Sequence, residues 1–384
     1  MPEVKVFLVA GEPSGDLLAS RLMRALKKQT KGAVSFSGVG GETMEQEGLN
    51  SLFDIKDLAL MGFFEVLPHL KVILGHIRQT LDEIERIKPD IVITVDSWSF
   101  SKQIHLGIQR RGIKVKHIHY VAPQVWAWRK KRARQIKAWV DYLLMLLPFE
   151  EKYFAPYKMA MRYVGHPVIE GGADKGDAKA FRKAHGIDEK TLLMTLLPGS
   201  RKSEIKYLLP VFYQVVLRLK KKHPDLMIVI PTVKTVEKQV REVVAKWNVP
   251  TEIVLGEKER YGAFAASAFA VAASGTVSLE LSMSKTPHLI AYKLNALTAF
   301  LARRLLKVRY VNLVNILADK EIIPELLQEN CTPDMIVKKA ESLLGKAGKK
   351  QTEEALRQMK KLGAGEKMLP SEKAAEQVLK IINE

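Results

Sequence analysis

An acidic residue at the end of an apolar run is the first candidate for catalysis. Ile91–Val95 predicts a buried strand, and Asp96 follows it directly. Residues after the carboxyl ends of parallel strands face the ligand site, where a carboxylate can take a proton from an attacking hydroxyl group. The alternative is a structural role as the N-cap of the next helix. Position alone does not separate the two roles.

Two glycine-rich loops lie in the same half of the chain. Gly11–Asp16 (GEPSGD) follows one apolar run, and Gly38–Gly41 (GVGG) ends another. Glycines permit tight turns and close backbone approach, and Ser14 and Asp16 can cap the following helix. GEPSGD lacks both the Gly-Lys-Ser/Thr ending of a P-loop and the spacing of a GxGxxG fingerprint. A plain strand-to-helix turn is the competing interpretation.

Two loops in the second half suit an anion. Leu197–Arg201 (LPGSR) enters a predicted helix, so its backbone N–H groups and Arg201 suit a diphosphate, with Glu204 placed to orient Arg201. Ser274–Thr276 (SGT) starts another helix, and Glu280, one turn on, suits ribose hydroxyls. Either loop alone is as well explained by a helix cap, but two in one domain are more specific.

Histidine and cysteine form no recognisable metal motif. No HExxH pair occurs, and the single cysteine, Cys331, excludes an internal disulfide and a Cys-rich zinc site. His117 and His119 alternate on a predicted strand, and His166 precedes a proline in the predicted linker, so we interpret all three as structural. We expect neither a metal nor a cofactor.

These loops need a scaffold of parallel strands. Short β-branched runs alternate with longer amphipathic segments, which is the signature of βαβ units. The predicted strands are Val4–Ala10, Ala33–Val39, Ile91–Val95, Val115–Val121 and Tyr142–Leu146, then Thr191–Leu197, Leu226–Ile230, Glu252–Leu255, Ala268–Ala272 and His288–Tyr292.

The elements between and after these strands complete the fold prediction. A helix is expected at about Leu17–Lys28, a linker at Gly165–Gly176, and Lys-rich helices from Pro333 onward. We therefore predict the α/β class, with two doubly wound, Rossmann-like domains facing across a cleft.

The charge is strongly basic. The 384 residues carry 61 Lys and Arg against 42 Asp and Glu, a formal net charge of +19. Such a chain attracts nucleic acid, anionic membranes and phosphorylated substrates. The densest cluster, Arg129–Arg134 (RKKRAR), follows Trp126 and Trp128, which suits single-stranded nucleic acid, a bilayer interface or a solvated helix face.

No cleavable signal precedes the first strand, and no window of about 18 apolar residues lacks charges. The nearest approach, Leu58–Ile77, is interrupted by Glu65, Pro68, His69 and Lys71. We therefore expect a cytoplasmic protein whose membrane contact is peripheral.

Further motifs stand in one order along the chain. They are GEPSGD (Gly11–Asp16), YVAPQVWAWR (Tyr120–Arg129), LPFE (Leu147–Glu150), VGHP (Val164–Pro167), LPGSR (Leu197–Arg201), SGT (Ser274–Thr276) and YVNLVNILADKEIIPELLQE (Tyr310–Glu329). With them the chain resembles the lipid-A-disaccharide synthase family over essentially its whole length, and GEPSGD and VWAWR are specific to that family.

The resemblance implies a GT-B architecture. An acceptor-binding and membrane-associating domain would cover residues 1–168, a UDP-sugar-binding domain 169–364, and a C-terminal helix at about 365–384 would cross back to the first domain. It also implies transfer of 2,3-diacylglucosamine from UDP to 2,3-diacylglucosamine 1-phosphate (lipid X), giving a β-1,6 disaccharide 1-phosphate and UDP in lipid A biosynthesis. The family inverts configuration and uses no metal.

The implied partners are the acylated UDP-glucosamine donor, the acylated glucosamine 1-phosphate acceptor and the inner face of the cytoplasmic membrane. No nucleic acid is expected, and a homodimer is left open.

The family's functional residues carry over by motif. Asp96 matches the general base for the acceptor 6-hydroxyl group. Asp96-Ser97-Trp98-Ser99 departs from the family's Asp-x-x-Asp pattern, which leaves a second assisting carboxylate open. The UDP-sugar side takes Gly199, Ser200, Arg201, Glu204, Ser274, Gly275, Thr276, Glu280 and Asn315; the acceptor side takes Glu12, Ser14, Gly15, Asp16, Gln124 and Trp126.

An apolar segment matches the family's membrane-contacting surface. Its predicted contact residues are Met61, Phe63, Phe64, Leu67 and Leu70. Because acyl chains must be drawn from a bilayer, we expect an exposed apolar patch flanked by Lys71 and Arg78. The alternative is an ordinary buried helix.

Two other functions compete. Another GT-B transferase or a non-hydrolysing UDP-sugar 2-epimerase would use the same UDP loops, but the epimerase needs no lipid-facing surface and releases no net UDP. A nucleic-acid-binding protein would show steeply salt-dependent binding, but that function leaves the LPGSR and SGT loops unexplained.

Overall fold

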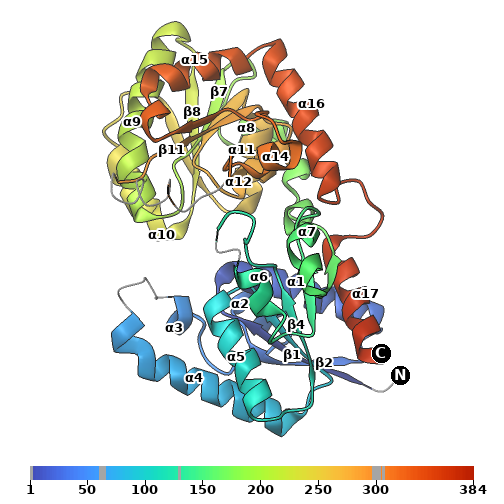
Figure 1. The fold of residues 1–384 in the computed structure, drawn as a ribbon. Helices are drawn as coiled ribbons and strands as arrows, with labels where there is room; N and C mark the ends of the chain where they lie inside the picture. The colour runs from blue at the N-terminus through green and yellow to red at the C-terminus, as the bar shows by residue number, and fades with distance from the viewer. Residues whose placement is uncertain (1–2, 60–65, 129–130, 296–303, 305–307) are drawn as a thin grey trace. The chain divides into compact units, whose positions relative to one another are not determined.

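The chain forms two compact α/β units. The computed structural model describes residues 3–59, 66–128, 131–295, 304 and 308–384. One unit comprises Met1–Pro167 and Glu366–Glu384, the other Val168–Gly365 (Figure 1). Each contains a six-stranded sheet whose paired strands are parallel. Two such units confirm the predicted class and the two Rossmann-like domains.

The first sheet has the strand order β2-β1-β3-β4-β5-β6. Its strands are β1 (Val4–Ala10), β2 (Val34–Val39), β3 (Ile91–Val95), β4 (Lys116–Tyr120), β5 (Tyr142–Met145) and β6 (Ala160–Tyr163). β1 and β3 match their predicted bounds residue for residue. β6 is absent from the prediction because this short edge strand alternates exposed and half-buried side chains and has no apolar run.

Helices cover both faces of this sheet. α1 (Pro13–Gln29) and α17 (Pro370–Asn383) pack on one face, and α4 (Val66–Ile87) and α5 (Trp98–Arg110) on the other. Alternate residues of β1 serve the two cores, Val6 and Leu8 the first, Phe7 and Val9 the second. Shorter helices are α2 (Glu42–Gln46), α3 (Lys56–Ala59), α6 (Lys131–Ile136), α7 (Glu151–Phe154), η1 (Ala155–Tyr157) and η2 (Pro167–Glu170).

The last helix of the chain returns to the first unit. α17 buries Val378 and Ile381 in the core that it shares with α1. Lys28 Nζ lies 2.7 Å from Glu372 Oε1, and Gln29 Nε2 donates to the Glu372 carbonyl at 2.8 Å. These contacts confirm the predicted C-terminal crossover.

The second sheet has the strand order β12-β11-β10-β7-β8-β9. Its strands are β7 (Leu193–Leu197), β8 (Met227–Thr232), β9 (Thr251–Leu255), β10 (Phe269–Ala272), β11 (His288–Tyr292) and β12 (Glu325–Leu327). Its helices are η3 (Ala173–Lys175), α8 (Ala178–Ala184), α9 (Lys202–Lys222), α10 (Lys234–Val244), α11 (Glu257–Ala266), α12 (Val277–Met283), α14 (Leu313–Ala318), η4 (Gln328–Asn330), α15 (Pro333–Leu343) and α16 (Lys346–Lys361). The short edge strand β12 is absent from the prediction, as β6 is.

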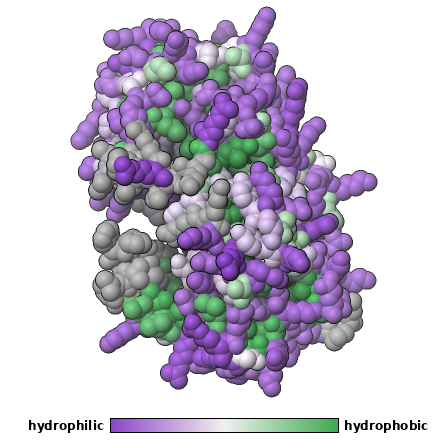
Figure 2. All heavy atoms as spheres, viewed as in Figure 1, coloured by the Kyte–Doolittle hydropathy of each residue, from purple (hydrophilic) through white to green (hydrophobic). Residues whose placement is uncertain are grey.

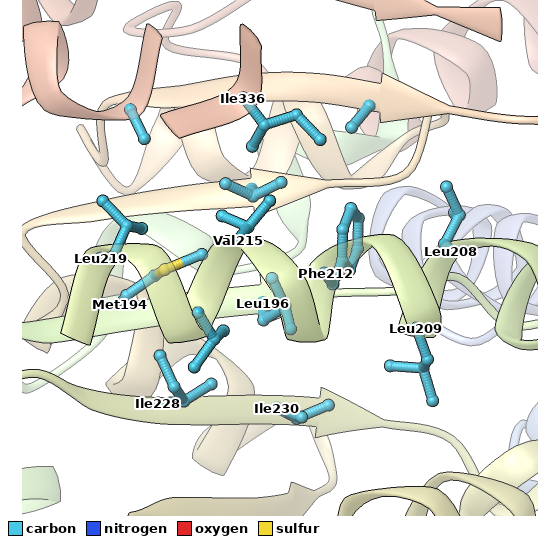
Figure 3. Close-up of a cluster of buried hydrophobic side chains, with 14 of the residues drawn as sticks. Met194, Leu196, Leu208, Leu209, Phe212, Val215, Leu219, Ile228, Ile230 and Ile336 are labelled. Atoms are coloured by element: carbon cyan, nitrogen blue, oxygen red, sulfur yellow. The ribbon is translucent and has the colours of Figure 1, made fainter. Parts of the chain in front are cut away.

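The core of this unit holds α9 against the sheet. Figure 3 shows Phe212, Val215 and Leu219 of α9 against the sheet residues Met194 and Ile228. Phe212 is fully buried, and burying a side chain of this size stabilises the fold by about 1.5–3 kcal/mol. The packing holds the LPGSR loop at the carboxyl end of β7.

Candidate active site

Asp96 directly follows β3 and is largely buried. Its backbone is left-handed (φ 52°), its N–H donates to the Tyr120 carbonyl at 2.9 Å, and its carbonyl accepts from Ser101 Oγ at 2.7 Å. Ser97, also left-handed (φ 48°), occupies the N-cap position of α5. The alternative role of Asp96 as that N-cap is therefore wrong.

Backbone strain gathers at this end of the sheet. Asp96 and Ser97 after β3 and Val121 after β4 (φ 87°) all have positive φ. A left-handed backbone costs a non-glycine residue on the order of 1–2 kcal/mol, and a β-branched residue such as Val121 adopts it rarely. Such strain persists where the surrounding structure enforces it, and it clusters at ligand sites.

The glycines of GEPSGD bring a second carboxyl group to Asp96. A Cβ on Gly11 would lie 2.5 Å from Ser97 Oγ, and one on Gly15 would lie 3.2 Å from the Val95 carbonyl oxygen. The loop therefore packs directly on the end of β3. Burial raises the pKa of Glu12, and the nearby charge of Asp96 raises it further. Burial also raises the pKa of Asp96, against the hydrogen bond from Ser97.

The carboxylate of Asp16 accepts hydrogen bonds from the start of a neighbouring helix. The side chain is buried, and Oδ1 accepts from Gly41 N at 2.8 Å and Met44 N at 3.0 Å. Oδ2 accepts from Thr43 N at 3.0 Å and Thr43 Oγ1 at 2.7 Å. Asp16 thus caps α2, and the prediction that it caps the helix following GEPSGD is wrong. Ser14 is exposed and Gly15 is buried.

The loop after β4 presents the other predicted acceptor residues. Gln124 is exposed, and the half-buried Trp126 packs edge-on against Phe149, with ring centroids 5.5 Å apart. Beside it Glu150 is buried and accepts from Leu147 N at 3.0 Å. Burial raises the pKa of Glu150 to about 8, so this carboxyl group holds a proton near pH 7. No role is predicted for Glu150 from the sequence, although it is the last residue of the LPFE motif.

In the second unit, three loops at the carboxyl ends of strands line a cavity of about 380 Å³ together with Arg260 of α11. The predicted donor residues Gly199, Ser200, Arg201, Glu204, Ser274, Gly275, Thr276 and Glu280 all line it. It is also lined by Leu197, Pro231, Thr232, Val233, Arg260, Ala273 and Val277. The structure therefore joins the LPGSR and SGT loops in one site.

Glu204 contacts Arg201 as predicted and has a further role in the backbone of the loop. Its Oε2 accepts from Ser200 N at 2.9 Å and Arg201 N at 3.2 Å, and its Oε1 accepts from Tyr292 Oη at 2.9 Å. These two N–H groups were expected to serve a diphosphate, but the Glu204 carboxylate takes them. Arg201 Nη1 lies 3.3 Å from Glu204 Oε1, and its side chain is 76% exposed. The guanidinium of Arg201 is thus the charged group of this loop that reaches solvent.

We expect Gly199→Ala to disrupt the LPGSR loop. Gly199 has φ +104°, and an added Cβ would lie 2.1 Å from Glu204 Oε2. The substitution should raise the KM for the donor at least tenfold and lower the free energy of unfolding by about 1–3 kcal/mol. Gly186→Ala is the control, because Gly186 also has positive φ (+62°) but open space around its Cβ position. Equal effects of the two variants on the donor KM would contradict the role of the Gly199–Glu204 contact.

Glu280 is held from the opposite wall. Arg260 Nη2 lies 3.1 Å from Glu280 Oε1, and the two side chains are 25% and 17% exposed. Gly275 has φ +145°, which places a glycine at the bend before α12. Glu280 is thus oriented at the edge of the cavity.

Asn315, the remaining residue predicted for the UDP-sugar side, lies outside the cavity wall. It is fully buried, and Nδ2 donates to the Ile323 carbonyl at 2.7 Å and Glu325 Oε1 at 2.8 Å. Oδ1 accepts from Ile322 N at 2.7 Å and Ile323 N at 2.9 Å. These contacts use the full hydrogen-bonding capacity of the amide. Asn315 orders the chain from α14 to β12 and does not line the cavity.

The histidines of the first unit form a buried network. Thr94 Oγ1 lies 2.7 Å from both His105 Nε2 and His119 Nδ1, and His105 Nδ1 lies 2.7 Å from His117 Nδ1. Burial lowers the pKa of each of the three histidines, that of His119 to about 3. Their contacts give His117 and His119 the structural role predicted for them. Within the described ranges, no group of three or more His, Cys, Asp or Glu side chains could hold a metal ion.

Comparison with known proteins extends this geometry. Residues 6–382 match the model of the lipid-A-disaccharide synthetase family. The chain is 45% identical to the lipid-A-disaccharide synthase of Rhodospirillum centenum, covering 100% of this chain and 96% of that protein. It is 45% identical to that of Paramagnetospirillum magneticum, covering 99% and 98%.

Solved structures share the fold at low identity. A putative UDP-N-acetylglucosamine 2-epimerase of Listeria monocytogenes aligns with TM-score 0.66 and 14% identity over 99% of this chain and 96% of that one. The UDP-GlcNAc 2-epimerase of Neisseria meningitidis bound to UDP-GlcNAc aligns with TM-score 0.60 and 12% identity over 99% and 100%. The glycotransferase of kitacinnamycin aligns with TM-score 0.62 and 14% identity over 99% of each chain. These likenesses concern the fold alone.

Proposed function

Since this chain belongs to the lipid-A-disaccharide synthase family, whose members are glycosyltransferases of lipid A biosynthesis, we propose that it transfers 2,3-diacylglucosamine from UDP-2,3-diacylglucosamine to 2,3-diacylglucosamine 1-phosphate. The products are the β-1,6 disaccharide 1-phosphate and UDP. The observation that carries the proposal is the cavity that LPGSR and SGT form together, because a nucleotide-sugar needs contacts for both its phosphates and its ribose.

We assign acceptor activation to the first unit. Asp96 is the general base that takes the proton of the 6-hydroxyl group as its oxygen attacks the anomeric carbon. Glu12 is the second carboxyl group beside it, and Ser14, Gly15, Gln124 and Trp126 are the further acceptor contacts. The role of Asp16 on this side is to hold α2 in place. Attack from the face opposite UDP inverts the anomeric configuration.

We assign the leaving group to the second unit. The bond between the anomeric carbon and the diphosphate oxygen breaks, and its electron pair stays on UDP. Positive charge near the diphosphate is needed to stabilise the negative charge that develops there. The exposed guanidinium of Arg201 and the N–H groups of Ser274–Thr276 supply that charge, while Glu280 binds the ribose. This charge compensation operates without a metal ion.

Membrane contact is proposed for the start of α4. Leu70, Val72 and Leu74 are 45%, 45% and 56% exposed, and Lys71 and Arg78 beside them are exposed too. Ile73 and Ile77 on the same helix pack toward the core. Figure 2 shows apolar side chains gathered at the surface over α4. Met61, Phe63 and Phe64 lie outside the described residues, as does the side chain of Leu67.

No helix of the described residues is long and apolar enough to cross a bilayer. We propose a peripheral location at the inner face of the cytoplasmic membrane, where the acyl chains of both substrates lie. Burial of exposed Leu and Val side chains among lipid chains stabilises such contact, with help from basic residues at anionic headgroups.

Replacing Leu70, Val72 and Leu74 together with serine should weaken binding to vesicles that contain an anionic phospholipid by about tenfold, because exposed apolar area is lost. The KM for the lipid acceptor should rise while UDP binding stays unchanged. Met335→Ser, at a 38% exposed position of α15, is the control. Unchanged vesicle co-sedimentation of the triple variant would refute membrane contact at α4.

The direct test is UDP release from the proposed donor with EDTA present, with and without the monosaccharide 1-phosphate acceptor. Acceptor-dependent release with formation of the β-1,6 disaccharide is the expected result. Activity on an unacylated UDP-sugar only, without net UDP release, would support an epimerase instead. Loss of turnover on adding EDTA would contradict the metal-free mechanism alone.

A further inference from the structure

Arg132 belongs to the basic cluster noted in the sequence, and it contacts two tryptophans of the first unit. Its Cζ atom lies 4.6 Å from the centroid of the Trp98 ring and 5.5 Å from that of the Trp128 ring. All three side chains are half-buried. A guanidinium over aromatic rings is attracted to them through its charge. The two indoles therefore orient Arg132 before a ligand arrives, which lowers the entropy cost of binding one.

Trp98 is itself anchored in the core. It begins α5, two residues after Asp96. Its ring packs edge-on against Trp139 and His119, with centroids 5.0 Å and 6.4 Å apart. Trp139 and His119 are 2% and 1% exposed, so the ring that supports Arg132 cannot move freely. The guanidinium is thus held beside the segment that carries the proposed base.

Trp128 connects Arg132 to the loop after β4. This loop also carries Gln124 and Trp126, which we assign to the acceptor. Arg132 therefore contacts both the segment after β3 and the loop after β4, and both belong to the acceptor side of the first unit. A cation in this position meets the acceptor rather than the donor.

The charge of the proposed acceptor requires a cation on this side. A phosphate monoester carries about −1.5 to −2 charges at pH 7. The first unit already places two carboxyl groups, Asp96 and Glu12, close together, and like charges at short range repel. In the acceptor, the carbon that carries the phosphate and the carbon next to the 6-hydroxymethyl group flank the ring oxygen. The phosphate group therefore lies within one sugar ring of the hydroxyl group that meets Asp96.

We propose that Arg132 binds the 1-phosphate of the acceptor and selects a phosphorylated acceptor over an unphosphorylated one. This inference rests on the proposed function, which supplies the acceptor. A guanidinium suits this role because its planar fork of N–H groups can donate two parallel hydrogen bonds to phosphate oxygens. The phosphate of a bilayer lipid offers the same chemistry, and the position of Arg132 beside Asp96 favours the substrate.

The test compares 2,3-diacylglucosamine 1-phosphate with 2,3-diacylglucosamine as acceptors, in detergent micelles without phospholipid. The measurement is kcat/KM for each acceptor at saturating donor. The wild type should prefer the phosphorylated acceptor about 10- to 100-fold, the usual effect of hydrogen bonds between charged groups. Arg132→Gln should abolish most of this preference by slowing the phosphorylated acceptor alone, and its Kd for UDP should equal that of the wild type. A merely structural role would lower both activities equally.

Arg134→Gln is the matched control, because Arg134 is exposed on the same helix, α6, and its loss removes the same charge. It should keep the preference of the wild type. Without substrates, the two variants should co-sediment equally with vesicles that contain an anionic phospholipid. Weaker vesicle binding of Arg132→Gln alone, with an unchanged acceptor preference, would assign Arg132 to a bilayer headgroup and overturn the proposal.

Two further outcomes of the kinetic comparison would overturn the assignment of Arg132. One is an unchanged preference in Arg132→Gln, and the other is an equal loss of activity on both acceptors. Equal use of the two acceptors by the wild type would overturn it as well, whether or not the variant folds. If the wild type transfers to neither acceptor, the proposed function itself fails, and this inference fails with it.

Discussion

Asp96→Asn should lower the turnover number by about 10²- to 10⁴-fold, the usual contribution of a general base. Asparagine preserves the size of the side chain and the backbone contacts of residue 96 with Tyr120 and Ser101. The protein should therefore stay folded and keep its affinity for UDP, whose binding we assign to the other unit. The measurement is steady-state UDP release with both lipid substrates, with UDP calorimetry beside it.

The pH dependence of the wild type belongs to the same prediction. A base must be ionised to accept a proton, so kcat/KM should fall as the pH decreases through the pKa of Asp96. Burial raises that pKa above its usual range, so the acidic limb should lie above the value near 4 of an ordinary aspartate.

Asp82→Asn serves as the control for Asp96→Asn. Asp82 lies on α4, is half-exposed and forms an ion pair with Arg111. It should leave turnover unchanged. Full activity in Asp96→Asn would leave the reaction in place and remove Asp96 as its base.

Acidification should destabilise the first unit more than the second. His105, His119 and His166 are buried there with lowered pKa values, about 3 for His119 and about 4 for His166. In the second unit His288 alone among the described histidines has a lowered pKa, about 4. A lowered folded pKa means that the unfolded chain binds the proton first. The stabilisation is therefore complete above the unfolded value of about 6.5 and declines as the pH falls below it.

At pH 5 each of these histidines should have lost about 2 kcal/mol of stabilisation relative to pH 7.5. Glu150 of the first unit acts in the opposite direction: its pKa is raised to about 8, so the folded state binds its proton first and gains about 3 kcal/mol over the same range. The net loss is then about 3 kcal/mol in the first unit and about 2 kcal/mol in the second. Trp247 is the only tryptophan of the second unit, so the fluorescence of Trp247→Phe during urea unfolding reports the first unit alone. Its urea midpoint should drop between pH 7.5 and pH 5. An equal midpoint at pH 7.5 and pH 5 would contradict the neutral histidine network.

Much of the scaffold is predictable because burial on two faces leaves continuous apolar runs in the sequence. β1, β3 and β11 are such runs, and their bounds agree with prediction. The edge strands β6 and β12 are short, and each pairs with a neighbouring strand on one side only. That pairing, rather than an apolar run in the sequence, determines where they form. The place of Asp96 was predictable for the same reason as β3, since the end of the strand determines it.

The bonding within the site was less predictable, because it depends on tertiary contacts. LPGSR was correctly predicted to start a helix, but the sequence does not show that Glu204 folds back onto Ser200 and Arg201. The side chain of Asp16 caps α2, which lies well beyond it in the sequence. The side chain of Asn315 makes its hydrogen bonds within the segment that leads to β12.

The position of α17 has a consequence for synthesis. Most of the first unit precedes Val168, but it is completed by Glu366–Glu384, which the ribosome makes only after the whole second unit. At 5–20 residues per second, translation of Val168–Gly365 takes on the order of 10–40 s. Throughout that interval the face of α1 that receives Val378 and Ile381 is uncovered. The nascent chain thus exposes an apolar surface that a chaperone can bind until α17 is made.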